Sequence, residues 1–571
     1  MEQVREAPAP DHLTMRLFAP GMSLLHRAGL GGLACTLKAM QREHEAGRLS
    51  ESKLPAPFAD GVPPWDIDEQ SVTLKFGKPE NAGEYLKKLF AYAFQINKDG
   101  LIYLPGQYGD VPPSLEVLVA IQDGIQNTFL QHGPSCGSRS GERTVTIEIN
   151  ETPVSLTYDV FTSYKHQGWF WLDRDEKSKE KDPITRKRLK TGRRVQLHQS
   201  LPVVGEDGAL SGKLHKIDNK LFPGGIVRHD RFDKSAIRET DAGLICMHFS
   251  LIGCLTLPVN RVTAVLLVPE VRDLLAFCQS RPWLTPGSAK ECRVAGAADA
   301  ALQAQVRVRA RRTAEESEIP ACYAMTCQPA QWDKNKKQKP RVATMLVPTG
   351  SDRILDRFEH ALTWLPPRLV VPAAPALKKS NRRNTKQPQP FWSDSVIRPL
   401  IAENLALGRK WYRGFVRLMT RIDPASGKPY RDRLIFEQKG LHDMIADETM
   451  WDEAGEATIV RAVHEALRGR YGQIAEENRD NPVAMRNRFS GEYDRWRLAF
   501  AGAKTADQFR KALCDLFSRA GSNAVLRESW QDVLPMLRAS AWQHARDLAL
   551  LGLCSYRGRG EADVTDQTES T

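Results

Sequence analysis

Apolar and polar residues follow two different rhythms in this chain, and the rhythm changes near residue 390. Before that point, apolar residues alternate with polar ones at 145–149 and again at 154–158, on either side of a short polar turn. A period of two is typical of half-buried strands, and two such runs around a turn predict a β-hairpin. Apolar runs at 262–268 and 344–347 predict buried strands, and residues 299–312 predict a helix.

After residue 391 the pattern becomes that of α-helices. Apolar residues recur every four positions on one helix face, at Ile459, Val463, Leu467 and Tyr471. Thr505 followed by Gln508 forms a capping-box sequence, and Gly521 suits the end of the same helix. We predict about five or six helices between Trp392 and Tyr556.

The predicted fold class is α+β, with a large mixed α/β N-terminal domain followed by a C-terminal all-helical bundle. A chain of 571 residues is too long for one hydrophobic core, so about two to four domains are expected. Four prolines surround a stretch that has too few apolar residues to fold alone. We predict an α/β nucleic-acid-binding domain at 1–370, a Pro-rich basic linker at 371–390, a helical bundle at 391–556 and a disordered tail at 557–571.

Cysteine usage and hydropathy exclude several classes of protein. The ten cysteines form no Cys-x-x-Cys pair, which argues against a zinc ribbon and a secreted disulfide scaffold. Reduced thiols are typical of the cytoplasm, where we expect this protein. No signal peptide is expected, because residues 1–10 lack an apolar core. The longest apolar run, 244–257, is too short to cross a bilayer, so no membrane partner is expected.

Charge separates the two regions as clearly as hydropathy does. From residue 391 onward we count 27 Lys/Arg against 26 Asp/Glu, a net charge of +1. The whole chain carries +12, so residues 1–390 carry +11. A basic first region and a nearly neutral helical region indicate a nucleic-acid reader joined to a protein-docking module.

Much of the positive charge lies in three compact runs. The first comprises Arg186, Lys187, Arg188, Lys190, Arg193 and Arg194; the second comprises Lys334, Lys336, Lys337, Lys339 and Arg341; the third comprises Lys378, Lys379, Arg382, Arg383 and Lys386. Trp169, Phe170 and Trp171 precede the first run, which predicts an aromatic strand with a basic tip. Aromatic rings can stack on bases and cations can hold phosphates, so the first two runs are our candidate nucleic-acid contacts.

A glycine-rich segment near the start of the chain is the other unusual feature. Residues 21–33 place four glycines among leucines, and they include His26 and Arg27. Glycines at this density indicate a close approach of the backbone to something else. That partner is either another element in a tight internal junction or RNA or another subunit, in which case His26 and Arg27 are contact residues.

The sequence contains only incomplete versions of catalytic motifs. Residues 208–213 resemble a phosphate-binding loop, but the glycine spacing is one residue short and Leu214 replaces the hydroxyl that would bind magnesium. His464 and Glu465 lack the second histidine of a zinc protease helix, because Arg468 occupies its place. We therefore predict no catalytic residue, no metal and no cofactor.

Several segments carry a resemblance to a known family. They are residues 19–33, 222–229, 462–468, 503–505, 517–521 and 545–550. The first of them, APGMSLLHRAGLGGL, resembles the start of the large subunits of type I CRISPR surveillance complexes (Cascade) of the MYXAN, or DevT-like, subtype. The resemblance implies a protein that is not an enzyme, and a C-terminal bundle similar to the small subunit of the complex.

The resemblance also implies a set of partners. A large subunit of this kind contacts the 5′ end of the crRNA, recognises the PAM in double-stranded target DNA, and recruits a helicase-nuclease or a transposition module. It assembles with the CRISPR backbone subunits and the handle-binding subunit. Small subunits are a further partner, with Met419 and Met444 as candidate internal start sites for making them from this chain.

Two other functional classes stay open at this point. A metal-dependent nuclease with a dispersed active site would show no compact motif. A protein-only scaffold would lack the salt-dependent nucleic-acid binding that the basic runs predict.

Overall fold

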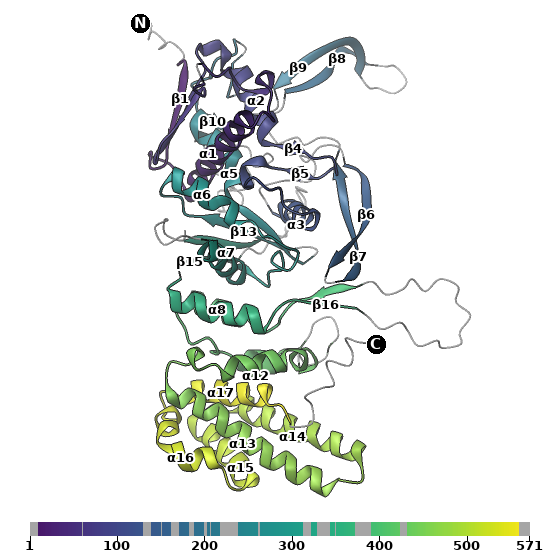
Figure 1. Cartoon of the computed structure of the whole chain (residues 1–571), viewed down its shortest axis with the longest axis vertical. Helices are drawn as coiled ribbons and strands as arrows, with labels where there is room; N and C mark the ends of the chain where they lie inside the picture. Colours follow the sequence, from purple (N-terminus) through teal and green to yellow (C-terminus); the bar gives the residue numbers. More distant parts are fainter. Residues whose placement is uncertain are drawn as a thin grey trace, which may run out of the picture. The chain divides into compact units, whose positions relative to one another are not determined.

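The chain divides into two compact units in a computed structural model. The first unit comprises Met1–Thr349 and Val371–Phe391, and the second comprises Gly350–Val370 and Trp392–Thr571. The structure describes residues 10–59, 61–128, 139–149, 151–161, 171–181, 188–198, 203–205, 207–216, 238–260, 263–311, 321–327, 343–348, 350–371, 390–422, 427 and 431–558. Figure 1 traces both units along the sequence.

The first unit is mixed α/β, as predicted, and its largest sheet is antiparallel. The strand order is β12–β13–β14–β15, and every residue of β13 is buried. Helices α3, α7 and α1 pack on this sheet. The four strands are β12 (Leu255–Asn260), β13 (Thr263–Pro269), β14 (Cys322–Cys327) and β15 (Ala343–Val347), and the main helices are α1 (Leu24–Glu45), α2 (Ala82–Ala93), α3 (Leu115–Gln126), α5 (Asp241–Gly253), α6 (Leu274–Leu284) and α7 (Ala297–Arg311).

Smaller sheets complete the first unit. One has three strands in the order β1–β3–β2, and the others are two-stranded. The predicted hairpin forms from β6 and β7, with Glu151 at its turn in a left-handed conformation. The strands are β1 (His12–Arg16), β2 (Trp65–Ile67), β3 (Ser71–Lys75), β4 (Gln95–Ile96), β5 (Ile102–Tyr103), β6 (Arg139–Ile149), β7 (Thr152–Phe161), β8 (Trp171–Lys181), β9 (Arg188–His198), β10 (His215–Lys216) and β11 (Arg238–Glu239).

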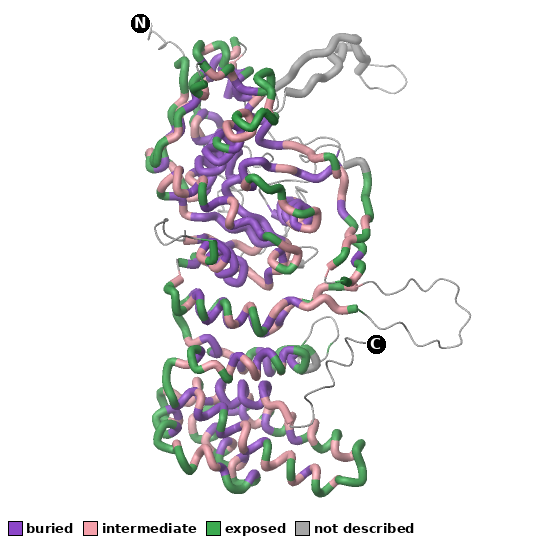
Figure 2. The backbone as a smooth tube through the Cα atoms, viewed as in Figure 1, coloured by how far each residue is buried: buried purple, intermediate pink, exposed green. Residues whose placement is uncertain are grey.

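The glycine-rich segment forms part of α1, and its close partner is helix α5. A Cβ atom on Gly29 would lie 1.7 Å from the Cys246 carbonyl oxygen, and one on Gly32 would lie 2.4 Å from that of Phe249. Gly253 on α5 returns the contact, because its Cβ would lie 1.8 Å from the Ala28 oxygen. The two helices therefore touch backbone to backbone, which confirms the predicted close approach. Figure 2 shows how continuously these helices are buried.

The second unit is helical, with one short strand pair formed by β16 (Arg368–Val370) and β17 (Phe391–Ser393). Among its described residues it has more helices than predicted. The described part of the chain from residue 392 onward contains nine α-helices, so the prediction of five or six was wrong. Two of them, α10 and α11, have five and four residues, too few to show a hydrophobic period. The α-helices are α8 (Asp352–Trp364), α9 (Arg398–Ala406), α10 (Val416–Thr420), α11 (Arg431–Leu434), α12 (Gln438–Ala446), α13 (Ala454–Glu477), α14 (Pro482–Gly502), α15 (Ala506–Ala520), α16 (Ala524–Val533) and α17 (Trp542–Ser555).

Helix α8 belongs to the second unit, whereas the sequence placed residues 350–370 in the N-terminal domain. Its apolar face, Leu355, Phe358 and Ala361, is completely buried, and the helix packs on α9 and α12. The predicted linker lies mostly outside the described residues. The two divisions of the chain therefore differ over residues 350–370.

The predicted caps of α15 are present. Thr505 accepts a hydrogen bond from the Gln508 amide at 3.3 Å, and Gly521 ends the helix at a φ of 85°. The Gln508 side chain returns the contact one residue earlier than in the usual capping box, by accepting from the Lys504 amide at 2.8 Å. No helix among the described residues combines the length and the apolar character needed to cross a bilayer.

Candidate nucleic-acid interface

The first basic run falls on a two-stranded antiparallel ribbon made by β8 and β9 (Figure 1). Four of its six cations, Arg188, Lys190, Arg193 and Arg194, are residues of β9. Trp171 is the first residue of β8. Arg186, Lys187, Trp169 and Phe170 lie outside the described residues.

The kinds of residue that pair across the two strands change along the ribbon. At the end where β8 begins and β9 ends, which we call the root, Leu172 pairs with Leu197 and Asp175 pairs with Arg194. The root thus holds one apolar pair and one pair of opposite charges. Farther out, Lys177 pairs with Lys190 and Lys181 pairs with Arg188. Like charges at directly opposite positions destabilise a strand pair, so these two pairs weaken the pairing of the outer half.

The chain is firmly held on both sides of the ribbon. Before it, the Phe161 amide at the end of β7 donates to the Gly100 carbonyl at 2.9 Å. After it, Val203 and Val204 are buried, and the Gly83 amide at the start of α2 donates to the Gly208 carbonyl at 2.9 Å. The ribbon is thus an insertion between two packed segments of the first unit.

A buried polar cluster fixes the loop that follows the ribbon. The carboxylate of Asp241, the first residue of α5, accepts from the Gly212 amide at 2.9 Å and lies 2.5 Å from His215 Nε2. The Ser211 hydroxyl lies within 3.2 Å of both groups. Serine and aspartate meet the same imidazole nitrogen, whereas a catalytic triad needs them on opposite nitrogens. The cluster therefore anchors residues 211–215, and the phosphate-loop-like sequence 208–213 is a turn packed against α2 and α5.

The second basic run connects two strands of the main sheet. Lys334, Lys336, Lys337, Lys339 and Arg341 lie outside the described residues, but the strands that flank them are described. β14 ends at Cys327 opposite Ala264, and β15 begins at Ala343 opposite Thr326. The β12–β13 turn lies at the same end of the strands, since Asn260 pairs with Thr263. The chain thus leaves β14 and enters β15 at one end of the sheet. The third run, 378–386, also lies outside the described residues.

His26 is a capping residue of α1. Its Nδ1 lies 2.7 Å from the Ser23 hydroxyl and accepts from the Ser23 amide at 3.2 Å, while the His26 amide bonds back to Ser23. Its Nε2 lies 3.4 Å from a Glu239 carboxylate oxygen. The residue is 4% exposed, which leaves no surface for a phosphate. We therefore assign His26 to the helix cap and leave it out of the interface.

Arg27 occupies a different environment from its neighbour. Its guanidinium carbon lies 5.5 Å from the centre of the Phe18 ring, and Phe18 is 57% exposed. The Arg27 Nε is buried and has no hydrogen-bond partner among the described residues. An arginine over an exposed aromatic ring offers both a charge and a flat surface to a nucleotide. A nucleic-acid contact at Arg27 stays a prediction.

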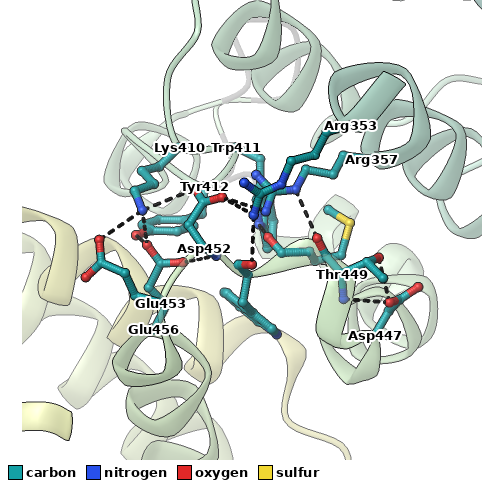
Figure 3. Close-up of polar contacts among 12 residues, drawn as sticks. Arg353, Arg357, Lys410, Trp411, Tyr412, Asp447, Thr449, Asp452, Glu453 and Glu456 are labelled. Atoms are coloured by element: carbon teal, nitrogen blue, oxygen red, sulfur yellow. Dashed lines mark hydrogen bonds and ion pairs between the residues drawn. The ribbon is translucent and has the colours of Figure 1, made fainter. Parts of the chain in front are cut away.

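The second unit contains a network of ion pairs that attaches α8 to the start of α13 (Figure 3). Asp452 is its centre, because Arg353 and Arg357 reach its Oδ1 at 2.7 Å and Lys410 reaches its Oδ2 at 3.1 Å. Glu456 receives Lys410 at 2.7 Å and the Tyr412 hydroxyl at 2.9 Å. Arg357 also donates to the Thr449 carbonyl at 3.0 Å.

The electrostatics of this network follow from its geometry. Burial raises the pKa of Asp452, but the hydrogen bonds from Arg357 and Lys410 outweigh it and leave that pKa below its usual value. Burial lowers the pKa of Lys410, and its bonds to Glu456 and Asp452 reverse this, so the net shift is upward. Both groups are therefore held charged, and the network is a structural tie rather than a reactive site.

Comparisons with known proteins cover nearly the whole chain. A model of the DevT N-terminal domain matches residues 14–248, and one of the DevT C-terminal domain matches residues 447–571. A CRISPR-associated protein Cas8a1/Csx13 of Myxococcus xanthus (strain DK1622) is 34% identical over 593 residues, which cover 99% of this chain and 92% of the relative. The chain belongs to the DevT family. The resemblance to MYXAN-type large subunits is thereby confirmed.

The DevT domains map onto distinct parts of the structure. The N-terminal match runs from β1 into α5 and so includes the ribbon and the glycine-mediated contact between α1 and α5. The C-terminal match contains α13 to α17. All the segments that carried the resemblance lie within one or the other match.

Sequence reasoning missed two residues of the ribbon in this DevT protein. Lys177 and Lys181 are separated from the first run in the sequence and stand beside Glu176, Glu180 and Asp182. A linear charge count therefore hides them. Only the strand register brings them opposite Lys190 and Arg188.

Proposed function

We propose that this chain is the large subunit of a CRISPR RNA-guided DNA surveillance complex. In this role it recognises the PAM in duplex DNA, contacts the 5′ end of the crRNA and the target DNA, and recruits a downstream effector. The observation that carries the proposal is its relation to Cas8a1/Csx13 across almost its full length, together with a basic ribbon in the DevT N-terminal domain.

The division of charge supports a division of labour between the regions. The first 390 residues, with a net charge of +11, would contact nucleic acid, whose backbone attracts cations at long range. The remaining residues, with a net charge of +1, would contact the CRISPR backbone subunits, the handle-binding subunit and the small subunits. The helicase-nuclease or transposition module would join the same assembly.

We propose that the chain has no active site of its own. The two motifs that came nearest to one have structural places here: Ser211, His215 and Asp241 anchor a loop, and His464 bonds to the Ser555 hydroxyl at 3.0 Å. Sequence reading then falls to base pairing with the RNA, and the protein reads a short duplex motif. The second basic run, Lys334 to Arg341, is our second choice for the PAM reader, since it includes Asn335 and Gln338 among its cations.

Purification of the complex from its native host tests this function. We expect crRNA and the backbone subunits to co-purify with the chain, and we expect duplex binding by that complex to weaken steeply with salt. A chain that purifies without RNA, and whose complexes bind DNA independently of salt, would indicate the protein-only scaffold. Cleavage of DNA or RNA by the isolated chain with Mg²⁺ or Mn²⁺ would indicate the nuclease instead.

A further inference from the structure

We propose that one face of the outer half of the β8–β9 ribbon binds the phosphate backbone of a B-form DNA duplex, an inference that rests on the proposed function. Four residues define this cationic face: Lys177, Lys181, Arg188 and Lys190. Two of them come from β8 and lie outside the basic run that the sequence identifies.

The register places these four residues on the same face. Directly opposite residues of an antiparallel pair share a face, which joins Lys177 to Lys190 and Lys181 to Arg188. Arg188 and Lys190 are two positions apart in β9, and alternate residues of a strand share a face. The two pairs therefore lie on one side of the ribbon, even though the register shifts between them.

Charge is divided along the ribbon at the same point. The described residues of the outer half, 177–181 and 188–190, contain five Lys/Arg and one Glu, a net charge of +4. Residues 171–176 and 191–198 contain three of each, a net charge of zero. The neutral root also holds the apolar pair Leu172–Leu197 and the opposite-charge pair Asp175–Arg194. The root thus holds pairs that favour strand pairing, whereas the outer half carries an excess of positive charge.

A row of anions would offset the repulsion within the Lys177–Lys190 and Lys181–Arg188 pairs. Two like-charge pairs weaken the pairing of the outer half as long as only solvent faces them. Phosphates spaced along a nucleic-acid strand supply charge at several positions at once, and their binding releases counterions. The face is therefore matched to a polyanion rather than to a single carboxylate.

The shape of the element favours a B-form duplex among polyanions. Neighbouring strands lie about 4.8 Å apart, and a two-stranded ribbon fits a B-DNA major groove about 12 Å wide. The deep, narrow major groove of A-form RNA excludes such an element. A ribbon lying in or across the wider groove brings its cationic face to the backbone of the DNA.

Paired substitutions in the assembled complex test the face. Lys177→Glu with Lys181→Glu puts carboxylates opposite Lys190 and Arg188, which should strengthen strand pairing and weaken DNA binding. The matched control is Arg174→Glu, a cation paired with Val195 on the other face of the ribbon. We expect the double variant to lose affinity for a duplex target and to flatten the salt dependence by about two units on a log–log plot, while the control stays near wild type.

Hydrogen exchange of the β8 amides shows whether the ribbon itself survives. We expect slower exchange in the unbound double variant than in wild type. Wild-type DNA affinity in the double variant, equal losses in the control, or faster ribbon exchange would each overturn the inference. A loss of affinity for double-stranded RNA alone would also overturn it. So would a loss of DNA affinity that follows only from substitutions in another subunit. A wild-type complex that captures no duplex would remove the proposed function, whereas unaltered flank-dependent capture by the double variant would remove only this inference.

Discussion

One buried histidine should add to the acid sensitivity of the helical unit. His464 on α13 stacks on His442 with ring centres 5.7 Å apart and bonds to the Ser555 hydroxyl. Burial, and then the positive charge of a protonated His442, lower the pKa of His464 to about 4 from an ordinary value of 6.5. The folded unit therefore holds this ring neutral where the unfolded chain would protonate it.

The sign of the pH effect follows from this difference. Between about pH 6.5 and 4 the unfolded chain binds the extra proton, so the free energy of unfolding falls as the pH falls, by about 1 to 3 kcal/mol in all. His464→Gln should remove this part of the acid sensitivity. Urea-unfolding midpoints of the full chain between pH 7 and 4.5 measure it, with the exposed His12→Gln as control. Equal acid sensitivity in wild type and H464Q would contradict the assignment.

Glycine at one position of α1 decides whether two helices can pack. Gly29→Ala would place its Cβ 1.7 Å from the Cys246 carbonyl oxygen, and backbone cannot move aside as a flexible side chain can. We expect a loss of stability of about 3 kcal/mol or more, at the upper end of overpacking effects. The control is Gly491→Ala in α14, where no atom lies within 4 Å of the new Cβ.

The control should behave in the opposite way. Alanine is the better helix former, so G491A should be neutral or stabilising by up to about 1 kcal/mol. Melting temperatures of the two variants separate the effects. Equal melting of G29A and wild type would mean that the contact between α1 and α5 is looser than described.

At the scale of elements, much of the fold could be predicted from local pattern. The hairpin of β6 and β7 follows from alternation, and the face of α13 follows from apolar spacing, because both signals lie within one element. The partner of the glycine segment could not be predicted, since α5 follows α1 only after a long stretch of sequence. The two divisions of the chain differ over α8 because its apolar face, Leu355, Phe358 and Ala361, carries no information about which core covers it.

The candidate site was predictable to a similar extent. The first basic run was visible in the sequence, but its completion by Lys177 and Lys181 depends on strand register. The burial of His26 depends on Glu239 and on its own cap, neither of which a spacing rule reveals. A run of charges can be seen in the sequence alone. Which residues share a strand face, and which contacts bury a residue such as His26, depends on segments that meet only in the folded structure.

At the scale of the whole molecule, the helical unit should begin at α8. A fragment covering 350–558 keeps Arg357 with Asp452 and Lys410 with Glu456. A product initiated at Met444 would lose Lys410 and Tyr412, and would leave Glu456, whose side chain is 2% exposed, without them. It would also remove the Gly414 and Val416 amides that donate to the buried Asp547. Buried carboxylates that lose hydrogen-bond and ion-pair partners are destabilising.

Fragments with different starts test this view. We expect 350–558 to unfold cooperatively, 392–558 to be less stable, and 444–558 to lack a cooperative transition when followed by circular dichroism on heating. A 444–558 fragment with the same midpoint as 350–558 would show that the segment before Met444 is dispensable. Intact-mass analysis of the purified complex decides separately whether initiation at Met419 or Met444 occurs at all.

We propose that this chain gives a surveillance complex its flank-dependent binding of duplex DNA. The most direct test measures capture of duplexes that share one target sequence and differ only in the flanking trinucleotide, by complexes reconstituted with and without the chain. We predict that capture varies strongly with the flank in the complete complex, since a correctly placed base contact discriminates by about 1–3 kcal/mol, and that this preference disappears without the chain. Equal capture of every flank by the complete complex, or an unchanged preference in its absence, would contradict the account.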